Sequence, residues 1–242
     1  EYIFTIASIP FLWSEAGSFQ KTIKIKKEKA VIKVHHLNNS RSQRILWLLE
    51  ELDLNYEVLR YERDAKTNLA PPELEAVHPL GKSPVIEDGG LKLHESGAIV
   101  EYLVRTYGKG RLAPEMGTED YAHYVEWLHY AEGSAMLPLL MRLYSQKLGA
   151  TSDMMDARIN GETINHFSFM NTHMADREFF VGDDVTGADV MMSFPLEAAG
   201  ARGGLEALPN LSGFVKRIQK RPAYLRALEK GGDYAYGPSS GS

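Results

Sequence analysis

The pair Ser83-Pro84 stands directly before an apolar, strand-like run that begins at Val85. Because proline cannot donate a hydrogen bond to a sheet, the pair is expected at the start or edge of a strand. A cis bond between the two residues would turn the backbone groups of Ser83 outward, where they can pair with a peptide-like ligand. The alternative interpretation is an ordinary turn before a strand.

A second pair, Glu95-Ser96, opens a predicted helix that runs to Tyr107. Serine is a favoured N-cap residue, so capping alone would account for Ser96. The start of a helix also presents unpaired backbone N–H groups and a positive dipole, which suit a carboxylate. Glu95 could accept a hydrogen bond from an ammonium group. A carboxylate and an ammonium on one carbon form an α-amino acid, so the pair indicates a binding site for such a group.

The 242-residue chain contains no cysteine. It therefore has no disulfides, no thiolate zinc site and no thiol nucleophile of its own. A thiol-disulfide oxidoreductase that uses its own cysteine is excluded, and any sulfur chemistry must use the thiol of a ligand. Adjacent His35 and His36 point to opposite faces of a predicted strand, so they are not expected to chelate a metal, and no metal site is predicted.

The net charge of -5 gives no basic excess that would favour nucleic acid as a partner. No apolar run approaches the ~18 residues that a membrane span needs. We therefore expect a cytoplasmic protein with neither nucleic acid nor membrane as a partner.

The elements that position these residues fall into two halves. Residues 1–30 read as an extension with a basic run at 21–29, and residues 237–242 read as a flexible tail. An α/β domain is expected over 31–110, with the order strand, helix, strand, hairpin, helix. After a linker, an all-helical domain is expected over 118–232, starting with one long aromatic helix from residue 121 to about residue 146.

Several segments together resemble the cytosolic glutathione S-transferases. In the first half these are NSRSQRILWLLEEL at 39–52, HPLGKSPV at 78–85 and LHESGAI at 93–99; in the second half, Thr186 and Asp189 match the superfamily's capping box. Residues 39–52 and 63–74 are also similar to the GTT-like branch of fungi and bacteria. The resemblance covers about residues 31–230. It implies a thioredoxin-like N-terminal domain followed by an all-α C-terminal domain, the glutathione S-transferase fold.

The resemblance also implies a binding site for glutathione as co-substrate. Glu95 and Ser96 match the residues that hold the γ-glutamyl group. Ser83, before a cis Pro84, matches the residue whose backbone pairs with the cysteinyl unit. Lys82 matches a basic residue near the glycyl carboxylate.

The glutathione thiol is expected at the junction between the first strand and the first helix. A free thiol has a pKa of about 8.5, so donors and a helix N-terminus are needed to favour the thiolate. Theta-like relatives carry serine where this sequence has Asn39. We expect the rotatable hydroxyl of Ser40 to be the principal donor to the sulfur. Asn39 and the backbone N–H groups are the alternatives.

The function implied is a glutathione transferase that attacks small hydrophobic electrophiles, a detoxification activity, and the resemblance also allows a glutathione-dependent peroxidase. A symmetric homodimer is implied as well. Tyr124, Trp127 and Glu132 are candidates for the electrophile pocket, although Tyr124 and Trp127 are also suited to the core. The alternative function is a non-catalytic binding protein that keeps the fold.

Overall fold

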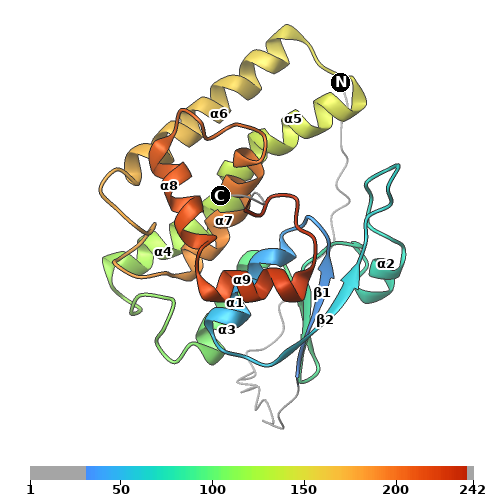
Figure 1. Cartoon of the computed structure of the whole chain (residues 1–242), viewed down its shortest axis with the longest axis vertical. Coiled ribbons are helices and arrows are strands. Elements are labelled where there is room, and N and C mark those ends of the chain that lie inside the picture. Colours follow the sequence, from blue (N-terminus) through green and yellow to red (C-terminus); the bar gives the residue numbers. More distant parts are fainter. Residues whose placement is uncertain (1–30, 239–242) are drawn as a thin grey trace, which may run out of the picture.

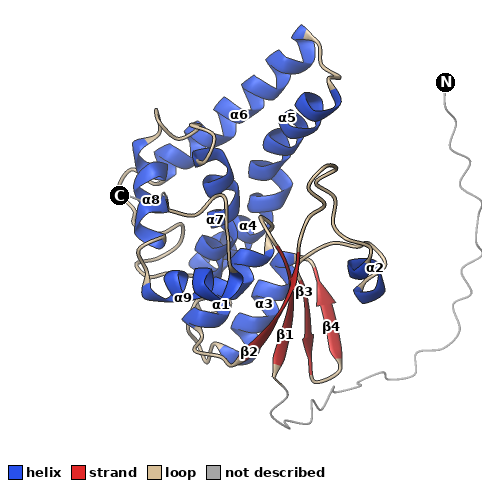
Figure 2. Cartoon of the chain, turned by 45° about the vertical axis from the view of Figure 1, so that its right-hand side comes forward, coloured by secondary structure: helices blue, strands red, loops and turns tan. Residues whose placement is uncertain are grey.

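The computed structural model describes residues 31–238. The predicted extension at 1–30, with its basic run, and the last four residues of the tail lie outside the described residues. The described chain forms an α/β half and then a helical half (Figures 1 and 2), as the sequence predicts. The α/β half consists of β1 (Ile32–Leu37), α1 (Ser42–Glu51), β2 (Tyr56–Tyr61), α2 (Glu73–Val77), β3 (Val85–Asp88), β4 (Leu91–His94) and α3 (Ser96–Tyr107).

The four strands form one mixed sheet in the order β2-β1-β3-β4. β1 pairs in parallel with β2 and antiparallel with β3, and β3 forms a hairpin with β4. The hairpin turns at Gly89 and Gly90, whose φ angles of +55° and +95° are readily adopted only by glycine. This arrangement confirms the thioredoxin-like fold expected for the first half.

Helix α1 is the element through which the two halves meet. Residues 42–50 are all buried, because α1 packs on β1 and α3 in its own half and on α7 and α9 of the helical half. The apolar residues of α1 fill the core on both sides, and its first turn lies at the boundary between the halves. A side chain placed at that first turn can therefore interact with both halves.

The helical half begins after a linker. It consists of α4 (Glu119–Tyr130), η1 (Ala131–Ala135), α5 (Met136–Leu148), α6 (Asp153–His173), α7 (Gly187–Gly200), α8 (Pro209–Ile218) and α9 (Pro222–Gly231). Helices α5 and α6 pack side by side as an arm that extends away from the sheet (Figure 2). Among the described residues, no helix combines the length and the apolar character that crossing a membrane would require.

The long helix predicted from residue 121 to about residue 146 is divided in the structure by η1, a π-helical turn. Gly133 lies within this turn and lowers the helix propensity there. A π turn holds an extra residue, so it changes which side chains face the rest of the molecule. Here it directs Glu132 toward the first turn of α1, where its carboxylate lies 2.7 Å from Arg41 Nε.

Helix α7 forms the centre of the helical half, with residues 187–199 all buried. A Cβ atom at Gly187 would lie 2.7 Å from the hydroxyl of Tyr124 and 2.8 Å from Val100. Only glycine fits at this point, where α3, α4 and α7 approach one another.

The predicted capping box begins α7. The Asp189 carboxylate accepts a hydrogen bond from the Thr186 N–H at 2.8 Å, and Thr186 Oγ1 accepts one from the Ala188 N–H at 3.2 Å. Asp189 also accepts one from the Phe180 N–H, at 2.8 Å. The carboxylate therefore fixes the loop before α7 as well as the start of the helix.

Helix α9 returns to the α/β half and lies along α1 (Figure 1). Arg221 forms an ion pair with Glu51 at 2.6 Å, and Arg226 forms one with Glu50 at 2.7 Å. The C-terminal helix thereby joins the two halves and fixes the helical half against the side of α1.

Candidate functional site

The segments predicted to carry chemistry gather at one end of the sheet. The strand register pairs Leu37, the last residue of β1, with Tyr61, the last residue of β2, and it pairs Val85, the first residue of β3, with His94, the last of β4. His35, near the end of β1, is also paired with Val85. The loop after β1, the segment before β3 and the start of α3 therefore meet at the same edge.

A cleft of about 740 Å³ opens at this edge and extends to α5 and to the C-terminal end of α7. Four of the predicted site residues line it, namely Asn39, Ser40, Lys82 and Ser83. Pro84, Glu95 and Ser96 are not among its lining residues. The cleft thus contains the predicted positions for the sulfur and for the cysteinyl and glycyl units, and the predicted γ-glutamyl position is next to it at the same end of the sheet.

The Ser83-Pro84 peptide bond is cis, as the family resemblance implied. The Ser83 hydroxyl donates to the carbonyl of His35 at 2.7 Å and accepts from the N–H of Leu37 at 3.1 Å. The side chain of Ser83 therefore forms hydrogen bonds with the end of β1, in place of the backbone hydrogen bonds that would continue the sheet.

Helix α3 starts at Ser96, and the residue in the N-cap position is Glu95, without a capping side-chain hydrogen bond. The alternative interpretation, in which Ser96 serves only as the N-cap, is therefore wrong: Ser96 occupies the first helical position. Glu95 is exposed and has a φ of +70°, a left-handed conformation that is costly for a non-glycine residue. Ser96 is buried, and Arg44 Nη1 donates to its hydroxyl at 3.5 Å.

At the start of α1, the Ser40 hydroxyl lies 2.8 Å from that of Ser42 and accepts from the Ser42 N–H at 3.2 Å. Ser42 Oγ lies 2.8 Å from Nδ1 of His36. Burial and, to a smaller extent, the charge of Arg60 lower the pKa of His36 to about 4. The imidazole is therefore neutral near pH 7, and a short chain of hydroxyls connects it to the cleft.

Asn39 precedes this chain in the left-handed conformation, with a φ of +50°. Its carboxamide oxygen accepts a hydrogen bond from the N–H of Ala235 at 2.7 Å. Because the oxygen is held by the C-terminal segment, the amide nitrogen of Asn39 remains as a donor at the cleft. The structure thus brings both predicted sulfur donors, Ser40 and Asn39, to the cleft wall.

Sequence reasoning missed a charged cluster beside these donors. The Glu132 carboxylate lies 2.7 Å from Arg41 Nε and 3.0 Å from Arg44 Nη2, and both guanidinium groups lie over the ring of Phe194. Burial alone would raise the pKa of Glu132, but the charges of Arg44 and Arg41 outweigh it and hold the pKa below its usual value. No sequence signal links Glu132 to Arg41 and Arg44, since the pairing depends on the π turn.

Two residues assigned to the electrophile pocket lie elsewhere. Tyr124 and Trp127 are only 1% and 2% exposed, and neither lines the cleft. Trp127 packs against Phe180 and His173, in the helical core. Glu132 is engaged with the two arginines. The assignment of Tyr124 and Trp127 to the electrophile pocket is therefore wrong, because their face of α4 supplies the core and α5 supplies the cleft wall. The assignment of Glu132 to that pocket stays a prediction.

His35 and His36 are both buried. Among the residues that the structure describes, no group of three or more His, Asp or Glu side chains is arranged to hold a metal ion.

The sequence was compared with known proteins. Residues 29–105 match the family model of the glutathione S-transferase N-terminal domain, and residues 135–222 match that of the C-terminal domain. Glutathione S-transferase 3 of Schizosaccharomyces pombe is 36% identical over 83% of this chain and 88% of its own length. Glutathione S-transferase 1 of Saccharomyces cerevisiae is 33% identical, over 83% of this chain and 95% of its own length. A crystal structure of a glutathione S-transferase from Actinobacillus pleuropneumoniae is 35% identical, with a TM-score of 0.77 over 86% of this chain and 100% of that chain.

Proposed function

Because this chain belongs to the glutathione S-transferase family, we propose that its cleft binds glutathione and activates the thiol for attack on small electrophiles. The observation that carries the proposal is the meeting of three segments at one end of the sheet. These are the start of α1, the segment before β3 and the start of α3. A tripeptide with charged ends needs separate partners for its two ends and its centre, and the three segments offer them.

The γ-glutamyl end is assigned to Glu95 and Ser96. The exposed Glu95 carboxylate can accept from the ammonium group, while the first turn of α3 offers unpaired backbone N–H groups to the carboxylate. The Ser96 hydroxyl lies at the same position and accepts a hydrogen bond from Arg44. The unusual backbone of Glu95 fits this role, since strained backbone is often retained where a ligand is held.

The centre and the other end of the tripeptide are assigned to the segment before β3. Since the Ser83 side chain already pairs with β1, its backbone N–H and C=O are left for the cysteinyl unit. The exposed ammonium of Lys82 lies on the cleft wall, suited to the glycyl carboxylate.

The sulfur is assigned to the loop between β1 and α1. We assign Ser40 as its principal hydrogen-bond donor, with Asn39 and the backbone N–H groups of the first turn of α1 beside it. The helix N-terminus adds positive potential, and all of these groups favour the thiolate over the thiol. In a transfer reaction the thiolate forms a bond to the electrophilic carbon, and the leaving group departs with its electron pair.

A glutathione-dependent peroxidase activity is proposed for the same site. The thiolate would attack one peroxide oxygen and break the O–O bond, and a second glutathione would then give glutathione disulfide and water. Overall, two glutathione molecules reduce one hydroperoxide to an alcohol and water. We also propose that the protein is a homodimer with a role in detoxification. We further propose a cytoplasmic location, where thiols are kept reduced.

An activity panel with the purified chain tests this function. It combines glutathione with an aryl halide, an epoxide, an organic hydroperoxide and a disulfide, and it is run beside calorimetric titration with glutathione. We expect saturable binding and turnover of at least the aryl halide. Binding without any turnover would leave only a binding protein, and absence of binding would contradict the assignment of the cleft.

A further inference from the structure

The part of the cleft that faces α5 is apolar. Met136, Leu139, Leu140, Leu143 and Leu148 all line it, at spacings of three, one, three and five residues along the helix. The first four of these side chains share one face of the helix, and Leu148 lies at its C-terminal end, where Tyr144 and Lys147 also line the cleft. Since none of the five belongs to the predicted glutathione positions, this stripe is available to the body of a second, apolar substrate.

Within the part of the chain that the structure describes, the same cleft is lined by cations and by no acidic residue. Besides Arg41 and Lys82, its wall includes Arg63 and Lys66 from the loop after β2, Lys147 near the end of α5, and Arg202 after α7. This concentration of positive charge is local, because the whole chain has a net charge of -5. Clefts of one sign concentrate ligands of the opposite sign.

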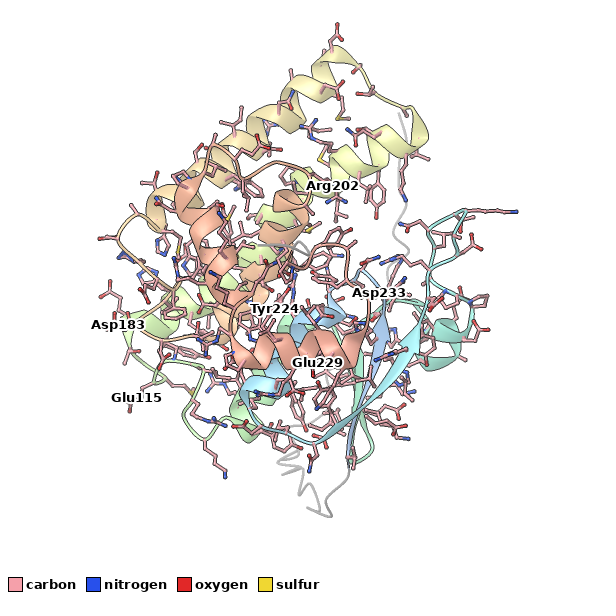
Figure 3. All side chains as sticks on the ribbon, in the orientation of Figure 1. Glu115, Asp183, Arg202, Tyr224, Glu229 and Asp233 are labelled. Carbon is pink, nitrogen blue, oxygen red and sulfur yellow. The ribbon has the colours of Figure 1, made fainter. Side chains whose placement is uncertain are left out.

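Two of these cations, Arg202 and Arg63, line the cleft from opposite halves of the chain. Arg202 lies over the ring of Tyr236 at 5.3 Å from its centroid, and its Nη2 donates to the Tyr236 hydroxyl at 3.5 Å. Arg202 lies beside α5 (Figure 3), and both contribute to the cleft wall. Arg63 lines the same cleft from the α/β half, where its guanidinium donates to the carbonyls of Asn38 and Asn68.

Within residues 31–238, neither Arg63 nor Arg202 forms a salt bridge: their acceptors are backbone carbonyls and, for Arg202, the Tyr236 hydroxyl. Burial and the nearby charge of Arg41 lower the pKa of the Arg63 guanidinium. A desolvated charge without a counter-charge is costly, and an anionic ligand would offset that cost. Glutathione does not supply this anion if its two carboxylates are held by Lys82 and by the start of α3.

We propose that the α5 side of the cleft selects electrophiles that combine an apolar body with a carboxylate, with Arg202 and Arg63 binding the carboxylate and the α5 stripe binding the body. This inference rests on the proposed transferase function and names its substrate class. Arg202 and Arg63 are specificity-determining residues, while the attack on carbon still depends on the glutathione sulfur.

A matched pair of aryl chlorides tests the selection. One is a chlorodinitrobenzoate and the other is its methyl ester, which has the same leaving group without the charge. In both reactions the sulfur–carbon bond forms, chloride leaves with its electron pair and the thiol proton goes to solvent. Each kcat/KM is divided by the uncatalysed rate with glutathione, because the ester activates the ring more than the carboxylate does.

For the wild-type chain we expect a normalised preference for the carboxylate of roughly tenfold, the size of one charge-assisted hydrogen bond. Arg202→Gln should reduce this preference about tenfold, and so should Arg63→Gln. The control is Arg158→Gln, which removes an arginine that is 74% exposed on α6 and should leave the preference as in the wild type. Added salt should lower the wild-type preference as well, without any substitution.

Turnover of the ester without a preference for the carboxylate would overturn the inference and leave the transferase function intact. A preference that survives in both arginine variants and at high salt would also overturn it. Turnover of neither compound, together with absent glutathione binding, would overturn the proposed function and this inference with it.

Discussion

The start of α3 combines the buried hydroxyl of Ser96 with the exposed carboxylate of Glu95, and we propose a separate role for each toward the γ-glutamyl group. The Ser96→Ala and Glu95→Ala variants should each bind glutathione about ten- to a hundredfold more weakly, since each loses one charge-assisted contact. Calorimetric titration measures this change. Glu115→Ala, a change in the linker between the halves, is the matched control. Wild-type affinity in folded variants would contradict the γ-glutamyl assignment.

The donors at the start of α1 can be separated by the pKa of the bound thiol. Ser40→Ala should raise that pKa by about one unit or more, because the thiolate loses a hydrogen-bond donor. Asn39→Ala should leave it near the wild-type value. The thiolate absorbance of bound glutathione, followed against pH, gives both values. The opposite pattern would assign the role to Asn39, and no shift in either variant would leave the helix N-terminus as the activator.

Most of the candidate site could be predicted from the sequence because its residues stand at element boundaries. Ser83, Ser96 and Ser40 each follow or precede a clear strand or helix pattern, and the sheet topology then places them together. The Arg41–Glu132 pair could not be predicted, since it joins residues 91 positions apart through a π turn. Arg202 was missed for a similar reason: only the packing of α7 beside α5 brings it to the cleft.

At the scale of elements, the sequence predicts that the capping box stabilises the start of α7. It does not predict the second role of Asp189, which is to fix the loop before the helix. A capping loss of about 1 kcal/mol follows from the sequence motif alone. In the structure the fully buried Asp189 also accepts from the Phe180 N–H, so its removal leaves a second donor unpaired. The spacing of Thr186 and Asp189 within the motif cannot reveal that the Asp189 carboxylate also accepts from Phe180, nine residues earlier in the chain.

Asp189→Ala should therefore lower the free energy of unfolding by about 2–4 kcal/mol, the sum of a lost cap and an unpaired buried N–H. Denaturant unfolding measures the loss. Asp183→Ala, in the exposed loop before the helix, is the control and should stay close to wild type. Loss of glutathione binding at unchanged stability would show that Asp189 acts on the ligand and does not serve the fold.

The helix predicted across residues 121–146 shows why the second half was harder to predict. Its apolar and aromatic residues predict a helix with a buried face. The π turn at Ala131–Ala135 then changes the face on which each later residue lies. Tyr124 and Trp127 consequently fill the core, whereas the stripe that begins at Met136 lines the cleft. Helical periodicity identifies a buried face without identifying what buries it.

At the scale of the whole molecule, we expect a two-fold homodimer. We expect the α/β half of one subunit to pack against the first helices of the helical half of the other, because two-fold dimers are the commonest soluble assembly. The aromatic residues Tyr124 and Trp127 do not contribute, because they are buried within their own subunit. Light scattering should give twice the 27.1 kDa mass of one chain, and a 27.1 kDa species alone at micromolar concentration would contradict the dimer.

A buried carboxylate on α7 makes the stability of the whole chain depend on pH. Glu197 is 2% exposed and accepts from the hydroxyls of Tyr224 (Figure 3) and Tyr234 and from Nε2 of Gln219. It therefore joins α7, α9 and the C-terminal segment. Burial raises its pKa to about 7, from 4.5. The folded chain then binds the proton more tightly than the unfolded chain does, so this contribution is fully present below about pH 4.5 and is lost as the pH rises through 7.

The change from Glu197 should amount to about 2–3 kcal/mol between pH 4.5 and pH 7.5, since one pKa unit corresponds to about 1.4 kcal/mol. Glu197→Gln removes the titration and keeps the shape, so its stability relative to wild type should increase as the pH rises over this range. Taking that difference cancels groups with the opposite sign, such as His36, whose lowered pKa makes the fold lose stability as the pH falls. Denaturant unfolding at several pH values measures it, with the exposed Glu206→Gln as control. A difference that does not vary with pH would mean that Glu197 is ionised throughout, held in that form by its three donors.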